Sequence, residues 1–302
     1  MLKKVFFLLI IGSLFFSLTA CEKEKGSEII SEKEGLDYYQ KGEYSKALPL
    51  LQKSADSGNP AAYYYLGKLY LANQRVEETG KNPCYCFLRA AEGAYPNAYL
   101  MVASCYFVGE GIEQDFNKAF KWGKKAAEVA DEIHMNDQDR LFLAVLMGSL
   151  YANGKGTLQD FSEAAKWFRQ AAEKDYAPAQ GMMAFYYYSG KGVLTDKEKA
   201  KYWAEKAAQK EDSVGQNMLG MLYQYADNPD MKQAVIWYEK AAAQGNYAAQ
   251  QALGSIYEKG NGVKKDLTKA YHYYRLAAKS GKDYTIKALS DFETKHKLES
   301  NP

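Results

Sequence analysis

Histidine and cysteine are scarce in this sequence, whose 302 residues include three histidines and four cysteines. His134, His272 and His296 stand far apart, and none has another histidine or a cysteine at the spacing that a zinc site requires. A Gly-x-Ser-x-Gly elbow and a phosphate-binding loop are also absent. These absences predict a protein that holds no metal, uses no cofactor and is not an enzyme.

An excess of charge of one sign is missing too. The formal net charge is +2, and without Lys3 and Lys4 of the expected leader it falls to zero. A chain without net positive charge has no long-range field with which to collect phosphate groups. Nucleic acid is therefore excluded as an expected partner.

Long hydrophobic runs are limited to the N-terminus, where Lys3 and Lys4 precede an apolar stretch over residues 5–18. That stretch is too short to span a membrane comfortably and is typical of a cleaved leader. Residues 18–21, Leu-Thr-Ala-Cys, resemble the lipobox of bacterial lipoproteins, in which the cysteine carries acyl chains such as palmitate. The resemblance implies a signal peptide over residues 1–20, a lipidated Cys21 and a tether over residues 21–31. The alternative is a plain secretory leader that is cut near Ala20.

Glu22, the residue after the lipobox cysteine, bears on where such a lipoprotein would lie. In the lipoprotein families an Asp at this place favours retention in the inner membrane, and Glu22 differs from it. The resemblance thus implies a lipid anchor in the outer membrane, with the protein facing the periplasm.

Two residue series recur along the rest of the chain with a common period. In the first, a small residue is followed three positions later by Tyr; in the second, an aromatic residue comes 19 positions after the small one, or 17 in one case. Successive repeats are 34 to 36 residues apart, with one interval of 45. The first series begins at Gly67, Ala103, Gly148, Ala184, Gly220 and Gly254, and the second holds Trp122, Trp167, Trp203, Trp237 and Tyr273, with Cys86 in the equivalent early place.

Most repeats carry a Gly-x-Gly turn between the two series and an Asp downstream of it, as at Gly154-Lys155-Gly156 and Asp160. Glycine can end the first helix with a positive φ, and Asp can cap the start of the second. Apolar residues on each expected helix recur with a period near 3.6, and Leu66 and Trp167 lie on the expected core positions. The pattern predicts about seven αα-hairpins that bury their apolar faces by stacking on one another.

The best copy of the motif, over residues 249–281, resembles the SEL-like repeat, a relative of the tetratricopeptide repeat. The resemblance implies an all-α, right-handed superhelical solenoid. We expect a tetratricopeptide-like first repeat over residues 32–60, SEL-like repeats over residues 61–283, and a capping helix and tail over residues 284–302. We also expect the capping helix to run from Tyr284 to Leu298.

Three cysteines remain apart from Cys21. Cys86 and Cys105 fall on expected core positions, so a disulfide between them would join the second and third repeats, and buried free thiols are the alternative. Cysteine-rich members of the family, some described as acting on β-lactams, carry paired cysteines within most repeats. This chain does not carry paired cysteines within most repeats, so the comparison disfavours an enzymatic function.

The first helices of such a solenoid form its concave wall, where a partner would bind. Their positions that face away from the expected core are aromatic or aliphatic in early repeats and amide-rich in later ones, where they include Gln180, Gln216, Asn217 and Gln250. The alternative is that the early aromatic residues pack on the preceding repeat. The candidate binding residues are Tyr63, Tyr64, Lys68, Leu71, Tyr99, Leu100, Phe107, Val145, Phe185 and Tyr188.

These observations favour a membrane-anchored adaptor that binds another protein or an extended peptide. The resemblance allows two further functions. One is an immunity protein that neutralises a phospholipase toxin delivered by type VI secretion. The other is a β-lactam or cell-wall enzyme, which would need a nucleophile with its base, and the sequence shows no such pair.

Overall fold

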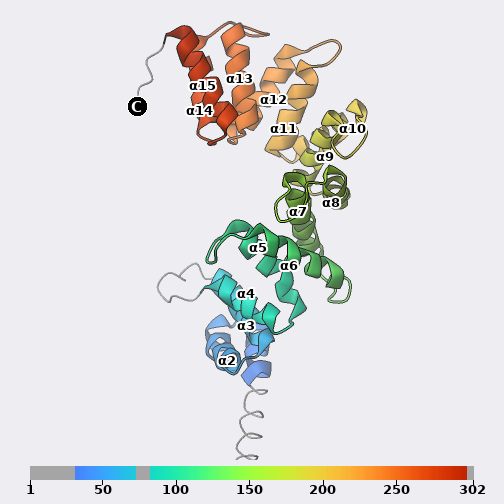
Figure 1. Ribbon diagram of the computed structural model, residues 1–302, viewed down its shortest axis with the longest axis vertical. Coiled ribbons are helices and arrows are strands. Elements are labelled where there is room, and N and C mark those ends of the chain that lie inside the picture. Colours follow the sequence, from blue (N-terminus) through green and yellow to red (C-terminus); the bar gives the residue numbers. More distant parts are fainter. Residues whose placement is uncertain (1–30, 73–81, 298–302) are drawn as a thin grey trace, which may run out of the picture. The chain divides into compact units, whose positions relative to one another are not determined.

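A computed structural model describes residues 31–72 and 82–297, and these are all-α, with no strand among them. The expected leader, Cys21 and most of the tether lie outside the described residues. Residues 31–40 are helical and pair with the first of the helices that follow (Figure 1). Those are α2 Tyr44–Asp56, α3 Pro60–Ala72, α4 Pro83–Glu92, η2 Pro96–Ala98, α5 Tyr99–Val108, α6 Phe116–Val129, α7 Asp137–Asn153, α8 Phe161–Glu173, α9 Ala177–Ser189, α10 Lys197–Gln209, α11 Ser213–Gln224, α12 Met231–Ala243, α13 Tyr247–Lys259, α14 Leu267–Ala278 and α15 Asp283–His296.

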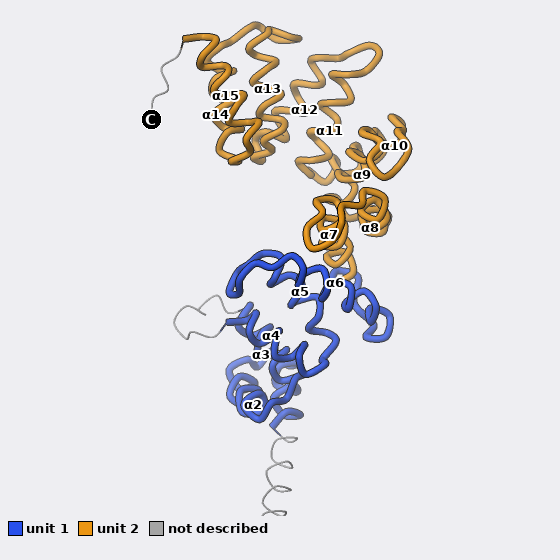
Figure 2. Tube along the Cα trace, viewed as in Figure 1, with its two compact units in different colours: residues 1–139 blue, residues 140–302 orange. Residues whose placement is uncertain are grey.

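The helices form two compact units, residues 1–139 and residues 140–302, and the boundary lies in the first turn of α7 (Figure 2). The first unit holds the hairpins up to α5–α6, and the second runs from α7–α8 to α13–α14 and ends with α15. Within each unit, consecutive helices pack side by side in chain order. The predicted all-α repeat fold is thus confirmed.

A glycine on one helix and a ring on the next hold most hairpins together. A Cβ added at each marker glycine would lie 2.6 to 2.9 Å from an aromatic ring of the second helix. Where the marker is Ala103 or Ala184, the matching residue of the second helix is small, namely Gly123 or Ala204. The glycine–ring pairs are Gly67 with Phe87, Gly148 with Phe168, Gly220 with Tyr238, and Gly254 with Tyr274.

This pairing corrects the predicted register of the second helices. The expected core residue Trp167 is only half-buried, whereas Phe168, one position later, is 1% exposed. Likewise Tyr238, which follows the half-buried Trp237, is 1% exposed. The tryptophans cover the edge of the core, and the residue after each faces the first helix.

In the turns before α6, α8, α10, α12 and α14, one aspartate closes the turn and caps the second helix. The backbone N–H of Asp196 donates to the carbonyl of Tyr187 at 2.9 Å, and its carboxylate accepts from the N–H of Lys199 at 2.9 Å. Asp115, Asp160 and Asp266 make the same pair of contacts, and their capping of the second helix is as predicted. The recurring Asp is therefore explained by the turn itself.

The second glycine of the Gly-x-Gly turn rests on the preceding repeat. Gly192 has a φ of +67°, and a Cβ there would lie 2.0 Å from the carbonyl oxygen of Phe161, the first residue of α8. Gly262 meets Met231, the first residue of α12, in the same way. Both of these turns thus dock on the start of the previous second helix, where a side chain would not fit.

Helix α15 ends the second unit as the expected cap. Phe292 of α15 is 2% exposed and packs on Tyr274 with ring centroids 5.2 Å apart. The nearly buried carboxylate of Glu258 accepts from Lys295 Nζ at 2.7 Å and from Tyr274 Oη at 3.0 Å, and it contacts His296 Nε2 at 3.2 Å. The observed bounds differ from the predicted ones by one residue at the start, and Leu298 lies outside the described residues.

Candidate protein-binding surface

The end of α3 presents two of the candidate residues to solvent. Lys68 is exposed, and Leu71 in the last turn is 61% exposed. Leaving a Leu side chain in water is unfavourable compared with burying it. The exposure of Leu71 is therefore a notable feature of the first unit. Val108, at the end of the next first helix α5, is 57% exposed.

A hollow of about 210 Å³ lies between these two residues. Its floor is the ring of Phe87, which is 2% exposed, and its sides come from α3, α4, α5 and the turn after α5. The remaining lining residues include Met101, Ser104, Cys84, Cys105 and Glu110. An apolar floor with exposed aliphatic rims is the arrangement that receives an anchoring side chain from a partner. We call this site the α3–α5 hollow.

A disulfide forms one side of the hollow and corrects the predicted bridge. Cys84, not Cys86, pairs with Cys105, with 5.8 Å between their Cα atoms, and Cys86 is a buried free thiol. Two residues apart on a helix are rotated by roughly 200° about its axis. Cys84 therefore faces α5, while Cys86 lies in the core cluster that contains Leu51 of α2 and Leu66 of α3.

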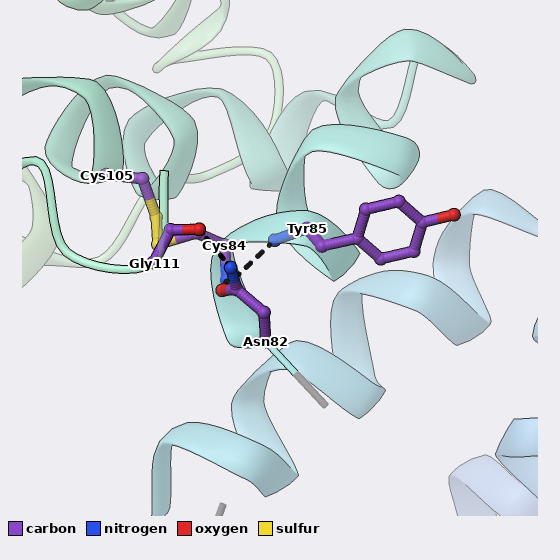
Figure 3. Close-up of a disulfide and its surroundings, with 5 residues drawn as sticks. All are labelled: Asn82, Cys84, Tyr85, Cys105 and Gly111. Carbon is purple, nitrogen blue, oxygen red and sulfur yellow. Dashed lines mark hydrogen bonds between the residues drawn. A yellow bond between two sulfur atoms is a disulfide. The ribbon is translucent and has the colours of Figure 1, made fainter. Parts of the chain in front are cut away.

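Asn82 fixes the start of α4 beside this disulfide. Its side-chain oxygen accepts from the N–H groups of Cys84 and Tyr85, and its amide nitrogen donates to the carbonyl of Gly111 in the turn after α5 (Figure 3). Figure 3 shows the ring of Tyr85 directed away from the disulfide. The disulfide and Asn82 together hold α4 to α5 and to the following turn at the edge of the hollow.

Two candidate residues are buried and cannot offer an open surface. Tyr64 is 8% exposed because its ring packs against Phe87 and Tyr95, and burial raises the pKa of its hydroxyl. Leu100 is 2% exposed. The prediction that these two residues belong to an exposed wall was wrong. Each first helix is covered by its neighbours on more sides than the single apolar stripe in its sequence indicates.

The other candidates are half-buried: Tyr63, Tyr99, Phe107, Val145, Phe185 and Tyr188. Some of them pack on the second helix of their own repeat. Tyr99 and Phe185 also pack against core clusters that include the preceding second helix, as the alternative had it. Tyr99 lies against Trp122 at 5.3 Å between ring centroids, and Phe107 lies against Phe116 at 5.8 Å. The structure thus leaves one side of these rings accessible.

The expected amide-rich wall is also corrected. Gln180, Gln216, Asn217 and Gln250 are all buried. The side chain of Gln250 donates to the carbonyl of Ala242 at 3.1 Å, and Gln180 donates to Ala172 at 3.2 Å. Because the last carbonyls of a helix have no partner within it, these amides satisfy the end of the preceding helix.

A further hollow, of about 330 Å³, lies in the second unit and was not predicted from the sequence. Tyr188, Leu222 and the 57% exposed Tyr225 line it, with Lys197 and Lys201 on the α10 side. Burial and the neighbouring Tyr225 raise the pKa of Tyr188. The signal that could have located it is the α11–α12 turn, which is two residues shorter than the others and lacks the Gly-x-Gly segment that elsewhere covers the preceding helix start.

Residues 31–72 and 82–297 contain no group of three His, Cys, Asp or Glu side chains arranged to hold a metal ion. No helix in these ranges is both long and apolar enough to cross a membrane. The fold, with hollows on its surface, is that of an α-helical repeat protein of the kind suited to protein–protein interaction.

The chain belongs to the Sel1 repeat family. The model of the Sel1 repeat matches residues 33–59, 96–131, 143–176, 177–212, 213–246 and 248–282. The unmatched interval, residues 60–95, holds α3 and α4, which form much of the α3–α5 hollow. No curated protein sequence matches the chain.

Two solved structures resemble the chain closely. A Sel1 repeat protein from Oxalobacter formigenes is 29% identical with a TM-score of 0.63, and the match covers 82% of this chain and 96% of that one. The c5321 protein of uropathogenic Escherichia coli, described as a protective antigen with an SLR fold, is 27% identical with a TM-score of 0.60. That match covers 90% of this chain but spans only 58% of the antigen. An immunity protein, Pa5087 of Pseudomonas aeruginosa, is more distant, at 19% identity and a TM-score of 0.41, over 73% of this chain and 80% of that one.

Proposed function

We propose that this chain is an adaptor that binds another protein through the α3–α5 hollow. The observation that carries the proposal is the pair of exposed aliphatic residues, Leu71 and Val108, on either side of a hollow with an aromatic floor. The disulfide and Asn82 keep the walls of the hollow in place before a partner arrives. A preformed apolar site binds with little loss of conformational entropy.

The partner should insert an apolar side chain between Leu71 and Val108. Lys68, one turn before Leu71, and Glu110, after Val108, provide charges of both signs at the rim. A polar rim around an apolar centre is typical of protein interfaces. We therefore expect a folded protein or an amphipathic segment as the ligand.

Site-specific photo-crosslinking tests the site. A crosslinking residue at position 71 or 108 should capture one protein from envelopes, whereas the same residue at Ile286, which is 48% exposed on α15, should not. With the captured protein purified, Leu71→Ala and Val108→Ala should each weaken binding by about 1–3 kcal/mol, as interface anchors do. Unchanged affinity in both variants would refute the site.

We further propose that the protein is held on the outer membrane through acylated Cys21 and faces the periplasm. The leader and the lipobox at residues 18–21 support this. Two or three acyl chains would anchor it essentially permanently. Cys21→Ser should leave the precursor uncut and without acyl label in a palmitate-labelling experiment, and continued labelling would contradict the anchor.

We also propose that binding is the whole function and that no substrate is turned over. A purified chain from Glu22 onward should hydrolyse neither β-lactams nor phospholipid esters above a blank. A rate that follows the protein through successive columns and disappears with one point mutation would overturn this part.

A further inference from the structure

A hollow of about 480 Å³ lies in the first unit between α2, α3 and the start of α4. Cys86 lines it, whereas Cys84 lines the α3–α5 hollow, so the two hollows lie on different sides of α4. Its walls carry the rings of Tyr63 and Tyr70 from α3 and of the exposed Tyr85 from α4. We call it the α2–α4 hollow. Its volume is within the usual range for sites that bind small molecules.

Cys86 stands where the five later hairpins carry an aromatic residue. The ring of Phe87, the next residue, meets the marker Gly67, just as the ring that follows Trp167 meets the marker glycine of its own hairpin. The equivalent residues of the later hairpins are Trp122, Trp167, Trp203, Trp237 and Tyr273. Because cysteine is much smaller than any of these, the α3–α4 hairpin lacks a ring that the later hairpins have.

Two of these later rings show which space a ring at position 86 would fill. Tyr273 stacks on Tyr257 of its first helix, with ring centroids 5.8 Å apart and 7° between the planes. Trp122 lies against Tyr99 of its first helix, with 5.3 Å between centroids. The equivalents of Tyr257 and Tyr99 in α3 are Tyr70 and Tyr63. Because both of these line the α2–α4 hollow, the hollow is the space that an aromatic ring fills elsewhere in the chain.

The α2 side of the hollow carries a carboxylate. Asp56 Oδ1 accepts from Gln52 Nε2 at 2.7 Å, and Gln52 Oε1 accepts from Tyr70 Oη at 2.9 Å. A carboxylate can accept several hydrogen bonds, and Asp56 is exposed. Among the described residues that line the hollow, no other side chain is charged, and Arg89 of α4 lies outside this lining and pairs with Glu92 at 3.2 Å. The hollow therefore favours a cation over an anion.

We propose that the α2–α4 hollow binds a small aromatic amine, with its ring between Tyr63 and Tyr70 and its ammonium group at Asp56. Aromatic rings attract one another in offset or edge-to-face contact, and charge strengthens a hydrogen bond from ammonium to carboxylate. Tyr85, which is 54% exposed and directed away from the disulfide, adds a third ring to the walls (Figure 3). Mostly aromatic and apolar walls with a few polar groups are typical of small-molecule sites.

Calorimetric titration of the chain from Glu22, with its disulfide intact, tests the proposal. The first probe is tryptamine, which carries a fused aromatic ring and an ammonium group. The second is indole-3-acetate, which has the same ring and a carboxylate. Tryptamine should bind at a single site, and indole-3-acetate should bind more weakly because Asp56 repels its charge.

Three variants alter the hollow. Cys86→Trp supplies the ring that the later hairpins have, so it should abolish tryptamine binding and keep the parent's melting temperature. Tyr85→Ala should weaken binding by about two- to tenfold, the range for a lost aromatic pair. Asp56→Asn should weaken it by about three- to fivefold, as the loss of an exposed ion pair does at most, and should reduce the preference over indole-3-acetate. If Cys86→Trp does not fold, the other two variants still decide, because they change exposed side chains.

Two matched controls come from the later hairpin in which Trp203 supplies the equivalent ring. Tyr202, which is 49% exposed, immediately precedes Trp203 and is the equivalent of Tyr85. Glu173 of α8 is the equivalent of Asp56, because each stands 14 residues before the recurring Tyr of the next first helix. Tyr202→Ala and Glu173→Gln remove the same kinds of ring and charge, and both should bind tryptamine as the parent does.

Several results would overturn the proposal. Tryptamine could fail to bind the parent, or it could bind a folded Cys86→Trp as tightly as the parent. It could also bind Asp56→Asn and Tyr85→Ala as tightly as their controls, which would place it elsewhere on the chain. If tryptamine does not bind but a crosslinking residue at position 85 captures a protein from envelopes, the hollow receives a partner's side chain instead. The crosslinking test at Leu71 and Val108 is separate, because neither residue lines the α2–α4 hollow.

Discussion

At the scale of single residues, a glycine on the first helix of a hairpin leaves room for an aromatic ring on the second helix. Gly148 leaves room for the ring of Phe168, and a Cβ there would lie 2.9 Å from it. Where the chain places Ala184, the opposing residue is Ala204, and both are fully buried. The two helices of a hairpin are therefore matched in volume, large against small, at a single level of the core.

This matching predicts that truncating two adjacent aromatic residues of α8 lowers the free energy of unfolding by different amounts. Phe168→Ala should lower the free energy of unfolding by about 3–5 kcal/mol, the usual range for a buried Phe. Trp167→Ala should cost clearly less, because Trp167 is half-buried. Urea midpoints of both variants check the order, and a Trp167 variant that unfolds as early as the Phe168 variant would restore the register expected from sequence.

Glu258 makes the cap of the second unit sensitive to acid. Burial raises the pKa of its carboxyl, but hydrogen bonds from Lys295, His296 and Tyr274 outweigh burial, and the net pKa is lowered from the ordinary 4.5. A lowered folded-state pKa means that the ionised group stabilises the fold above the ordinary value. That contribution is lost as the pH falls through the folded-state pKa.

Glu258→Gln should therefore destabilise the protein near neutral pH, and the difference from the parent should shrink as the pH falls below about 4.5. Thermal unfolding of both chains across this range measures the difference. Lys287→Gln is the control, because Lys287 pairs with Asp291 on the open surface of α15. A difference that stays constant with pH would contradict the role of the Glu258 carboxylate.

At the scale of the elements, the turns determine how repeats stack. The first glycine of each Gly-x-Gly segment ends a helix, whereas the second touches the preceding repeat. Where the α11–α12 turn lacks the segment, the hollow beside Tyr225 is open. A local feature of the turn thus sets the contact between hairpins.

Substitutions at two glycines of the second unit distinguish the cost of a positive φ from the cost of disturbing the contact with the preceding repeat. Gly192 and Gly245 both have positive φ, but a Cβ would collide with backbone at Gly192 and meets nothing within 4 Å at Gly245. Gly245→Ala should cost about 1–2 kcal/mol from the left-handed backbone alone. Gly192→Ala should cost distinctly more in the same urea titration, and equal costs would show that the contact with Phe161 is unimportant.

The disulfide predicts a redox-dependent stability of the first unit. It closes a loop of 21 residues, for which the expected contribution is about 3 kcal/mol. Adding a reductant should therefore destabilise the parent and Cys86→Ala, but should leave Cys105→Ala unchanged. Peptide mapping without reductant should link Cys84 to Cys105, and a link through Cys86 would contradict the structure.

Sequence patterns located the hairpins and their capping aspartates because these depend on neighbours within one turn, as at Asp115 and Asp266. They misplaced contacts that depend on how a helix is rotated. Trp167 was taken as core but is half-buried, and Cys86, which is buried as expected, was wrongly paired with Cys105. The α3–α5 hollow could be located in part, since Leu71 was a candidate, but Val108 and Cys84 were missed because their place depends on the packing of α4 against α5.

At the scale of the whole molecule, each unit is a linear stack in which a hairpin contacts its neighbours in the chain. Tyr238 of α12, for example, packs in one cluster with Leu253 and Ile256 of the next hairpin. In such arrays stability is close to a sum of local terms. Damage to one hairpin is therefore expected to spread along the stack and to fade with distance.

Tyr238→Ala tests this expectation by amide hydrogen exchange. Protection should fall most in α11, α12 and α13, and the hairpins of the first unit should exchange as in the parent. The buried Ala234→Gly on the same helix should give a smaller effect with the same distribution. An equal loss of protection throughout the chain would show that the molecule unfolds as one cooperative body.

The Cys84–Cys105 link also changes how the protein would respond to mechanical force. If the chain is pulled from its two ends, helices of a linear stack unravel and each freed residue adds up to about 3.6 Å of contour length. The 21-residue loop cannot be drawn out while the disulfide is intact, so the oxidised protein should extend by roughly 70 Å less than the reduced one. A chain held at its two ends would thus keep α4 joined to α5 beside the α3–α5 hollow under load.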